Sequence, residues 1–161
     1  MYNILILYDS IFGNTEKLAK AMSKSLEGSY QVELRSVDEV FPERLDDTNF
    51  LIVGSPTRNA KPTGGLVEFL KKIPSQGLNG VKFVTFDCRL AKPELKKHFI
   101  YLSLSWFLGY AGDKISKKLA LLGGIKVAPN EGFYVNGIEG PLKNGELERA
   151  EKWVKSILAQ A

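Results

Sequence analysis

Short, nearly continuous apolar runs, separated by segments of helical period, limit the fold of this chain most. Three of these runs are apolar along almost their whole length: YNILILY (2–8), FLIVGS (50–55) and VKFVTFD (81–87). Such runs are typical of strands that are covered on both faces of a sheet. Residues 30–37 alternate instead between apolar and polar side chains, which predicts an edge strand. A fifth strand is expected within residues 125–135, bent or interrupted near Pro129 and Gly132.

The segments between the runs have the period of amphipathic helices. Leu18, Met22 and Leu26 recur every four residues, and Gly28 follows as the expected C-cap. Further helices are predicted at 64–73, at 113–122 and near the end of the sequence, where the inward stripe is Leu147, Ala150, Val154, Ile157 and Leu158. This alternation predicts an α/β fold, with a parallel sheet, right-handed crossovers and helices on both faces. Ligands of such sheets bind at the carboxyl ends of the strands.

Length and composition favour one globular domain over residues 1–161. A chain of 161 residues buries about two thirds of the surface of its unfolded form, so it needs no disulfide or metal for stability. The opening residues do not match a signal peptide, and no run approaches the roughly 20 apolar residues of a membrane-spanning helix. Cys88 is the only cysteine and His98 the only histidine, which excludes an intrachain disulfide and a Cys/His zinc site. We therefore expect a cytoplasmic protein.

The net charge of +4 and the pI of about 9.1 are a weak signal for an acidic partner. Lysine and arginine are spread among glutamates, as in GELERAEKWVK (145–155), and aromatic and basic residues do not interleave as in a single-strand binding face. We expect no nucleic-acid partner.

The loop after the first predicted strand is rich in small polar residues. Ser10, Gly13, Asn14 and Thr15 lie between that strand and the first predicted helix. A helix N-terminus has unpaired amides and the positive end of the helix dipole, so it binds phosphate without a cationic side chain. The alternative is an ordinary turn with Asn14 or Thr15 as the N-cap. The sequence contains neither GxGxxG for a dinucleotide nor GxxxxGKS for a nucleoside triphosphate.

Four stretches in chain order resemble the flavodoxin family. YDSIFGNTE (8–16) resembles the family's phosphate-binding loop, an S-x-T-G-N-T-E type pattern, with Phe12 where the family usually has Thr. VGSPTRNAKP (53–62) and FDCRL (86–90) resemble the loops on the two sides of the flavin ring. The closing GFYVNGIEGPLKNGELERAEKW (132–153) is similar to the family's C-terminal stretch.

The resemblance implies a flavodoxin-like, doubly wound, five-stranded parallel sheet of strand order 2-1-3-4-5 that binds FMN. Carried over residue by residue, it assigns the cofactor site to Ser10, Ile11, Phe12, Gly13, Asn14, Thr15, Ser55, Pro56, Thr57, Arg58, Asn59, Asp87, Cys88 and Arg89. The protein would carry electrons between a reductase and an acceptor. The alternative is an FMN-dependent NAD(P)H:quinone-type oxidoreductase of the same fold that acts on a small quinone, so whether the protein is an enzyme stays open.

Two other readings remain beside these. A phosphate-responsive receiver domain has the same strand order, but it needs an acceptor Asp at the end of the third strand, where this chain has VGSPT (53–57). A domain that has lost its flavin and acts only through binding is the other reading. Neither a catalytic acid–base pair nor an activated nucleophile is visible in the loops.

The chain departs from the family in the loops beside the flavin. Flavodoxins usually place aromatic side chains there, whereas this chain has residues such as Arg58, Cys88 and Arg89. Stacking would therefore come from Trp106, Phe107 or Tyr110, or be absent. We expect Arg58 or Arg89 to approach the flavin and to favour its anionic, fully reduced form. Cys88 is expected to be a packed residue rather than a redox thiol.

The stretch HFIYLSLSWFLGY (98–110) is apolar almost all the way round if it is helical. Three readings are open: packing within the subunit or in a homodimer, contact with a partner or a quinone, and contact with a membrane surface, for which lysines on both sides are suited. His98 is expected on a helix surface.

Overall fold

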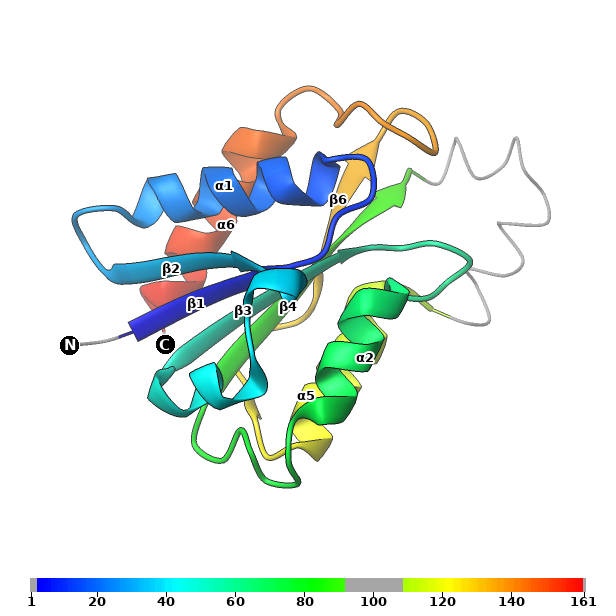
Figure 1. Ribbon diagram of the computed structural model, residues 1–161. Helices are drawn as coiled ribbons and strands as arrows, with labels where there is room; N and C mark the ends of the chain where they lie inside the picture. The colour runs from blue at the N-terminus through cyan, green and yellow to red at the C-terminus, as the bar shows by residue number, and fades with distance from the viewer. Residues whose placement is uncertain (1–2, 92–108, 161) are drawn as a thin grey trace.

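The structure is a computed structural model that describes residues 3–91 and 109–160 (Figure 1). The strands are β1 (Asn3–Tyr8), β2 (Gln31–Ser36), β3 (Phe50–Pro56), β4 (Lys82–Leu90), β5 (Ile125–Lys126) and β6 (Glu131–Val135). The α-helices are α1 (Asn14–Leu26), α2 (Gly64–Lys72), α5 (Ala111–Leu121) and α6 (Glu146–Leu158). Two short 3-10 helices, η1 (Val37–Glu39) and η2 (Pro42–Asp47), connect β2 to β3.

All the strand pairs are parallel, and the order β2-β1-β3-β4-β5 confirms the predicted topology. The nearly continuous apolar runs became the buried strands β1, β3 and β4, whereas the alternating run became the edge strand β2. This arrangement brings the loops after β1, β3 and β4 to one edge of the sheet, because parallel strands end on the same side.

The predicted fifth strand is divided into two pieces. β5 pairs with the start of β4, and β6 pairs with its end, from Phe86 opposite Glu131 onward. The interruption contains Pro129, as expected. Gly132, in contrast, lies inside β6. The prediction that Gly132 bends or interrupts the strand was therefore wrong. A glycine is needed there because the Arg89 side chain comes close to the backbone of β6.

Helices cover both faces of the sheet: α1 and α6 one face, α2 and α5 the other (Figure 1). The first face packs Leu18 and Met22 of α1 and Val154 of α6 against β1, β3 and β4. The second face packs Leu66 of α2 and Ile115 of α5 against the opposite side of the same strands. The amphipathic stripes thus bury their apolar sides as the period predicts.

Helix boundaries follow from local chemistry. α1 ends at Leu26 with Glu27 at the C-cap position, and Gly28, with a φ of 80°, turns the chain after it. α5 begins two residues before the predicted 113, because the amides of Ala111 and Gly112 find side-chain acceptors in Thr57 and in Asp87 of β4.

The predicted inward stripe of α6 was wrong at Leu147, which is 38% exposed. Glu146 occupies the inward position of the first turn instead and is buried. Its carboxylate accepts hydrogen bonds from the amide of Tyr134, at 2.7 Å, and from Arg149. A satisfied polar contact has therefore replaced an apolar one at the start of this helix.

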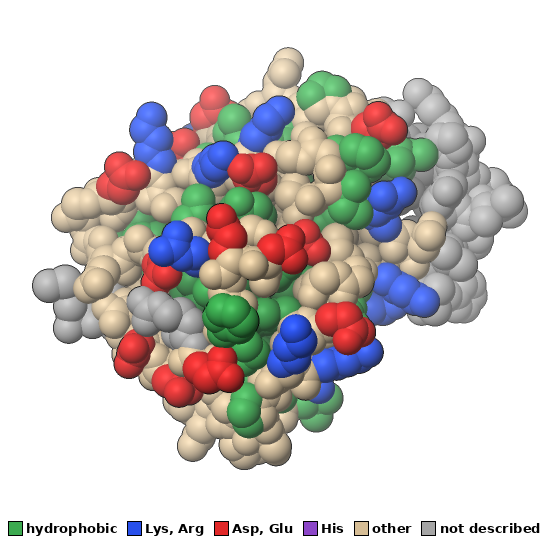
Figure 2. Space-filling view, in the orientation of Figure 1, with side chains coloured by type: hydrophobic (Ala, Val, Ile, Leu, Met, Phe, Trp, Pro, Cys, Tyr) green, Lys and Arg blue, Asp and Glu red, His purple; other side chains and the backbone are tan. Residues whose placement is uncertain are grey.

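Basic and acidic side chains intermingle on the face seen in Figure 2, where no large patch of one sign stands out. Among the described residues, none of the helices is long and apolar enough to cross a membrane. Apart from Gly109 and Tyr110, the apolar stretch 98–110 lies outside the described residues, and so do His98, Trp106 and Phe107.

Candidate functional site

A cavity of about 120 Å³ opens where the loops after β1 and β3 meet the end of β4. More of its wall is apolar than polar. The residues that line it are Phe12, Asn14, Thr15, Pro56, Thr57, Arg58, Asn59, Ala60, Cys88, Arg89, Leu90, Tyr110, Val135 and Ile138. This is the edge at which the topology predicts a ligand site.

The loop after β1 leaves hydrogen-bond donors without partners. Gly13 is the N-cap of α1 with a φ of 83°, a left-handed conformation that favours glycine, and no side chain caps this helix. The amide of Ser10 donates to the carboxylate of Asp9 at 2.8 Å. The Ser10 hydroxyl is buried and has no hydrogen-bond partner among the described residues. An orphaned buried hydroxyl beside an uncapped helix start suits an anionic ligand.

The first two residues of α1 connect this loop to the rest of the site. Asn14 and Thr15 are buried. The Asn14 Nδ2 donates to the carbonyl of Glu139 at 3.0 Å, and the Thr15 hydroxyl donates to the Cys88 Sγ at 3.4 Å. The start of α1 is therefore attached both to the end of β4 and to the loop after β6.

The loop after β3 is a tight two-residue hairpin. Asn59 and Ala60 have φ values of 47° and 59°, and Arg58 and Lys61 exchange backbone hydrogen bonds of 3.0 and 2.9 Å on either side of them. Positive φ at both central residues is the pattern of a type I′ turn. The amide of Thr57 donates to the carbonyl of Cys88 at 2.8 Å, which ties this loop to β4.

Arg58, in the loop after β3, reaches Phe12 in the loop after β1, and both residues line the cavity. Its guanidinium carbon is 5.4 Å from the centre of the Phe12 ring, which is a cation–π distance. Arg58 is exposed, and no ion pair holds its charge within the described residues. Phe12, the position where the sequence departs from the family pattern, is 42% exposed.

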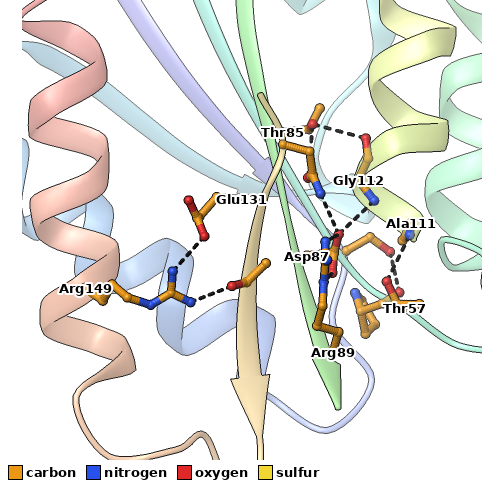
Figure 3. Close-up of polar contacts among 12 residues, drawn as sticks. Thr57, Thr85, Asp87, Arg89, Ala111, Gly112, Glu131 and Arg149 are labelled. Atoms are coloured by element: carbon orange, nitrogen blue, oxygen red, sulfur yellow. Dashed lines mark hydrogen bonds and ion pairs between the residues drawn. The ribbon is translucent and has the colours of Figure 1, made fainter. Parts of the chain in front are cut away.

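Arg89, the other arginine expected near the flavin, differs from Arg58 because it forms an ion pair. Its Nε and Nη2 each donate to the carboxylate of Asp87 at 2.6 Å, and the Asp87 side chain is fully buried (Figure 3). Burial acts to lower the pKa of Arg89, but the hydrogen bonds and charge of Asp87 outweigh it and leave the pKa above its ordinary value. The Arg89 charge is thus compensated at close range.

Cys88 is a buried thiol in the cavity wall. Burial raises its pKa to about 12, although the hydrogen bond from Thr15 acts in the opposite direction. Because the thiolate is the reactive form, Cys88 is protonated and inert at neutral pH. Its place in the wall agrees with the expected role of a packed residue.

The structure brings nine of the fourteen predicted site residues to the cavity wall. Ser10, Ile11 and Gly13 are neighbours in the same loop, and Ile11 is 46% exposed. Ser55 and Asp87 lie beneath the wall, fully buried, and their side chains hold other parts of the protein in place. For example, the Ser55 hydroxyl accepts a hydrogen bond from the amide of Thr63 at 3.1 Å.

Sequence reasoning missed four wall residues: Ala60, Leu90, Val135 and Ile138. Ala60 and Leu90 lie within stretches that carry the family resemblance, so the quoted motifs already contained them. Val135 and Ile138 lie in the closing stretch, for which no ligand role was inferred. Tyr110, one of three candidates for an aromatic contact, does line the cavity.

Comparison with known proteins agrees with the family resemblance seen in the sequence. A family model described as a flavodoxin domain matches residues 5–127. A flavodoxin of a Picosynechococcus species is 44% identical over 59 residues, which are 37% of this chain and 35% of that protein. A flavodoxin of Aquifex aeolicus is 42% identical over 60 residues, 35% of this chain and 32% of that one. The matches thus span about a third of the length of these curated relatives.

Solved structures match over the whole fold. Oxidised flavodoxin 2 from Bacillus cereus has a TM-score of 0.78 at 19% identity, with 99% of both chains covered. Rubredoxin oxygen:oxidoreductase from Desulfovibrio gigas has a TM-score of 0.71 at 19% identity, and the match covers 98% of this chain and 35% of that one. The family-model match, which spans most of the chain, shows that the protein belongs to the flavodoxin family, whose cofactor is FMN.

Proposed function

We propose that this protein binds FMN non-covalently in the cavity at the carboxyl edge of the sheet and transfers electrons between redox partners. The observation that carries the proposal is the convergence of the loops after β1 and β3, the end of β4 and the start of α5 on one cavity. The family membership and the fit of the individual residues support it.

The loop after β1 fits a phosphate group. The Ser10 hydroxyl lacks a partner among the described residues, and α1 begins at Gly13 without a side-chain cap. These donors and the positive end of the helix dipole would hold the FMN phosphate. Phe12 removes one hydroxyl of the family pattern, so the remaining donors carry this contact.

The rest of the wall fits a flat, largely apolar ring system. Pro56 and Leu90 offer apolar surface, Tyr110 offers an aromatic ring, and Thr57 and Asn59 add polar groups. The type I′ turn and the hydrogen bond from Thr57 to Cys88 hold the loop after β3 in shape. A preformed loop lowers the ordering cost of binding.

When bound, FMN supplies the redox chemistry, because its ring system accepts and releases electrons. The residues of this chain bind the cofactor, orient it and set the charge around it. No acid, base or nucleophile of the chain takes part in this proposal, since Cys88 is protonated and Asp87 is paired with Arg89.

The test is titration of the apoprotein with FMN and, in parallel, with riboflavin, which has the same ring system but no phosphate. We expect FMN to bind with quenching of its fluorescence and to stabilise the protein against urea, by about 2.7 kcal/mol at a hundredfold excess over Kd. Riboflavin should bind much more weakly. A protein that binds neither flavin at millimolar concentration would refute the proposal.

The FMN-dependent quinone-type oxidoreductase is the second candidate. The apolar wall of the cavity, including the half-exposed Ile138, favours it, because an apolar acceptor needs such a surface. Steady-state turnover of NAD(P)H and a small quinone by the isolated holoprotein would establish this activity. Electron transfer only with an added reductase would identify a carrier.

The partners of a carrier would be a reductase and an acceptor protein, and its setting would be the cytosol. A single cysteine that is buried and protonated agrees with a reducing compartment. Homodimerisation, and contact of residues 98–110 with a partner or a membrane surface, remain predictions from the sequence.

A further inference from the structure

We propose that Asp87 and Arg89 form a positioning pair that holds Tyr110 in the cavity wall as the aromatic contact of the flavin. The inference rests on the proposed FMN site and adds to it a specific aromatic residue and the device that fixes it. It also replaces the expectation that Arg89 acts on the flavin through its charge.

Asp87 organises this part of the site. It is fully buried, and its carboxylate accepts hydrogen bonds from four donors of three other residues. Two come from Arg89, one from the amide of Gly112 at 3.1 Å, and one from the Nδ2 of Asn130 at 3.0 Å. A carboxylate with this many donors is satisfied and has a single orientation. Asp87 therefore fixes the direction of the Arg89 side chain (Figure 3).

The Arg89 guanidinium lies between a ring and a glycine. Its Cζ is 3.5 Å from the centre of the Tyr110 ring. On another side it approaches Gly132 so closely that a Cβ there would lie 2.4 Å from the Arg89 Cζ and Nε. No side chain larger than hydrogen fits at Gly132 without moving Arg89. The planar guanidinium thus supports the Tyr110 ring.

The backbone that carries Tyr110 is held from two sides. Tyr110 is the N-cap residue of α5, and its own side chain makes no capping hydrogen bond. The next two amides are satisfied from other elements: Ala111 donates to the Thr57 hydroxyl at 2.9 Å, and Gly112 donates to Asp87 at 3.1 Å. Thr57 directly follows β3 and Asp87 lies in β4, so the start of α5 is tied to both strands beside the cavity (Figure 3).

The test compares FMN binding and the residual fluorescence of bound FMN among variants. A tyrosine ring in contact with a flavin quenches its fluorescence by electron transfer from the electron-rich phenol, which a residue with a purely structural role does not do. Tyr110→Ala should weaken FMN binding about tenfold and should raise the fluorescence of bound FMN. Tyr110→Phe, which keeps the ring, should bind FMN as the unaltered protein does.

Tyr134→Ala is the matched control. Tyr134 also lies near an arginine, with the Arg149 Cζ 5.6 Å from its ring, but it does not line the cavity. Its replacement removes a ring of the same kind from the neighbouring part of the sheet. We expect the FMN Kd and the bound-state fluorescence to stay unchanged in this variant.

Two further variants test the positioning pair without removing Tyr110. Gly132→Ala places a methyl group where the guanidinium lies and changes no charge. Arg89→Lys keeps the charge but loses the planar, two-point contact with Asp87. Both variants should weaken FMN binding severalfold and raise the fluorescence of bound FMN. Urea unfolding of each apoprotein, compared with that of Tyr134→Ala, verifies that the variants are folded.

The results separate the inference from the proposed function. If the unaltered protein binds FMN but Tyr110→Ala changes neither Kd nor fluorescence, Tyr110 is not the aromatic contact and the inference fails alone. If Arg89→Lys behaves as the unaltered protein, the charge of Arg89 matters rather than its shape, and the positioning role is refuted. Failure of the unaltered protein to bind FMN refutes the proposed function itself.

Discussion

Among the described residues, Arg58 and Arg89 both line the cavity, and Arg58 is the one without an ion pair. Arg89 forms a two-point ion pair with the buried Asp87, and the pair as a whole is neutral. The Arg58 side chain is exposed, and its guanidinium lies over the face of the Phe12 ring. An opposite charge close to a reduced, anionic flavin stabilises that form. We therefore expect the electrostatic effect predicted from the sequence to come from Arg58.

We predict that Arg58→Ala lowers the midpoint potential of the last one-electron step in the reduction of bound FMN by about 20 to 40 mV. This range corresponds to about 0.5 to 1 kcal/mol for one electron, which is reasonable for an exposed charge near the flavin in a high-dielectric setting. Potentiometric titration measures the shift. Lys61→Ala is the control, because Lys61 lies in the same loop but outside the cavity wall. Equal shifts in both variants would show a general effect of net charge.

Cys88 should make the free energy of unfolding fall as the pH rises into the alkaline range. Its pKa is raised by burial from 9.0 to about 12. The contribution of its neutral thiol is fully present below pH 9 and is lost as the pH rises toward 12, because the unfolded chain releases this proton first. Between pH 8 and pH 10 the loss from this group should be about 1 kcal/mol.

Urea unfolding of the unaltered protein and of Cys88→Ala at both pH values checks this prediction. The unaltered protein should lose about 1 kcal/mol more than the variant between pH 8 and pH 10. Tyr8, whose pKa is also raised, mainly by burial, titrates alike in both proteins and cancels in the comparison. Parallel pH profiles would contradict the assignment to Cys88.

At the scale of elements, the central strands β3 and β4 pack tightly, because the Phe86 ring of β4 lies directly over Gly54 of β3. A Cβ at Gly54 in β3 would lie 2.1 Å from the ring carbon Cζ of Phe86 in β4. Phe86 in turn packs edge-to-face against Phe133 and Trp153, with ring centres 6.0 and 6.4 Å away. The ring therefore has nowhere to move when the space over Gly54 is filled.

Gly54→Ala should lower the free energy of unfolding by about 1 to 3 kcal/mol through overpacking. Gly64→Ala is the matched control, since a Cβ at Gly64 in the first turn of α2 meets nothing within 4 Å. That variant should keep the stability of the unaltered protein to within about 0.5 kcal/mol or increase it slightly. Urea denaturation measures both changes. A Gly54→Ala protein as stable as Gly64→Ala would mean that the core relaxes freely.

The whole molecule carries a net charge of +4, with basic and acidic groups interspersed on the face seen in Figure 2. A modest net charge of this kind attracts anionic reaction partners over long distances and is screened by salt. The reaction rates of the reduced holoprotein should therefore depend on the charge of the oxidant.

We predict that oxidation of the reduced holoprotein by ferricyanide, an anion, slows as the ionic strength rises from about 10 to about 300 mM. Oxidation by hexaamminecobalt(III), a cation, should become faster over the same range. Stopped-flow absorbance at the flavin band measures both rates. The opposite pair of slopes would show that the charge near the flavin, and not the net charge, governs the encounter.

Local patterns in the sequence were enough to predict a parallel α/β sheet with helices on both faces, and the family resemblance added the strand order. Apolar runs and amphipathic periods reflect burial along a single element, so they identify β1, β3, β4 and the helices without knowledge of their partners. The quoted motifs also identified most of the cavity wall, because parallel strands bring their following loops to one edge.

Only the tertiary structure decided which groups pair with one another. Arg89 follows Asp87 by two residues, but their pairing depends on Gly132, Asn130 and the start of α5, which are distant in sequence. The burial of Glu146 in place of Leu147 likewise depends on the amide of Tyr134 in β6. The partner of a polar or charged side chain is chosen by long-range packing, and no local period records that choice.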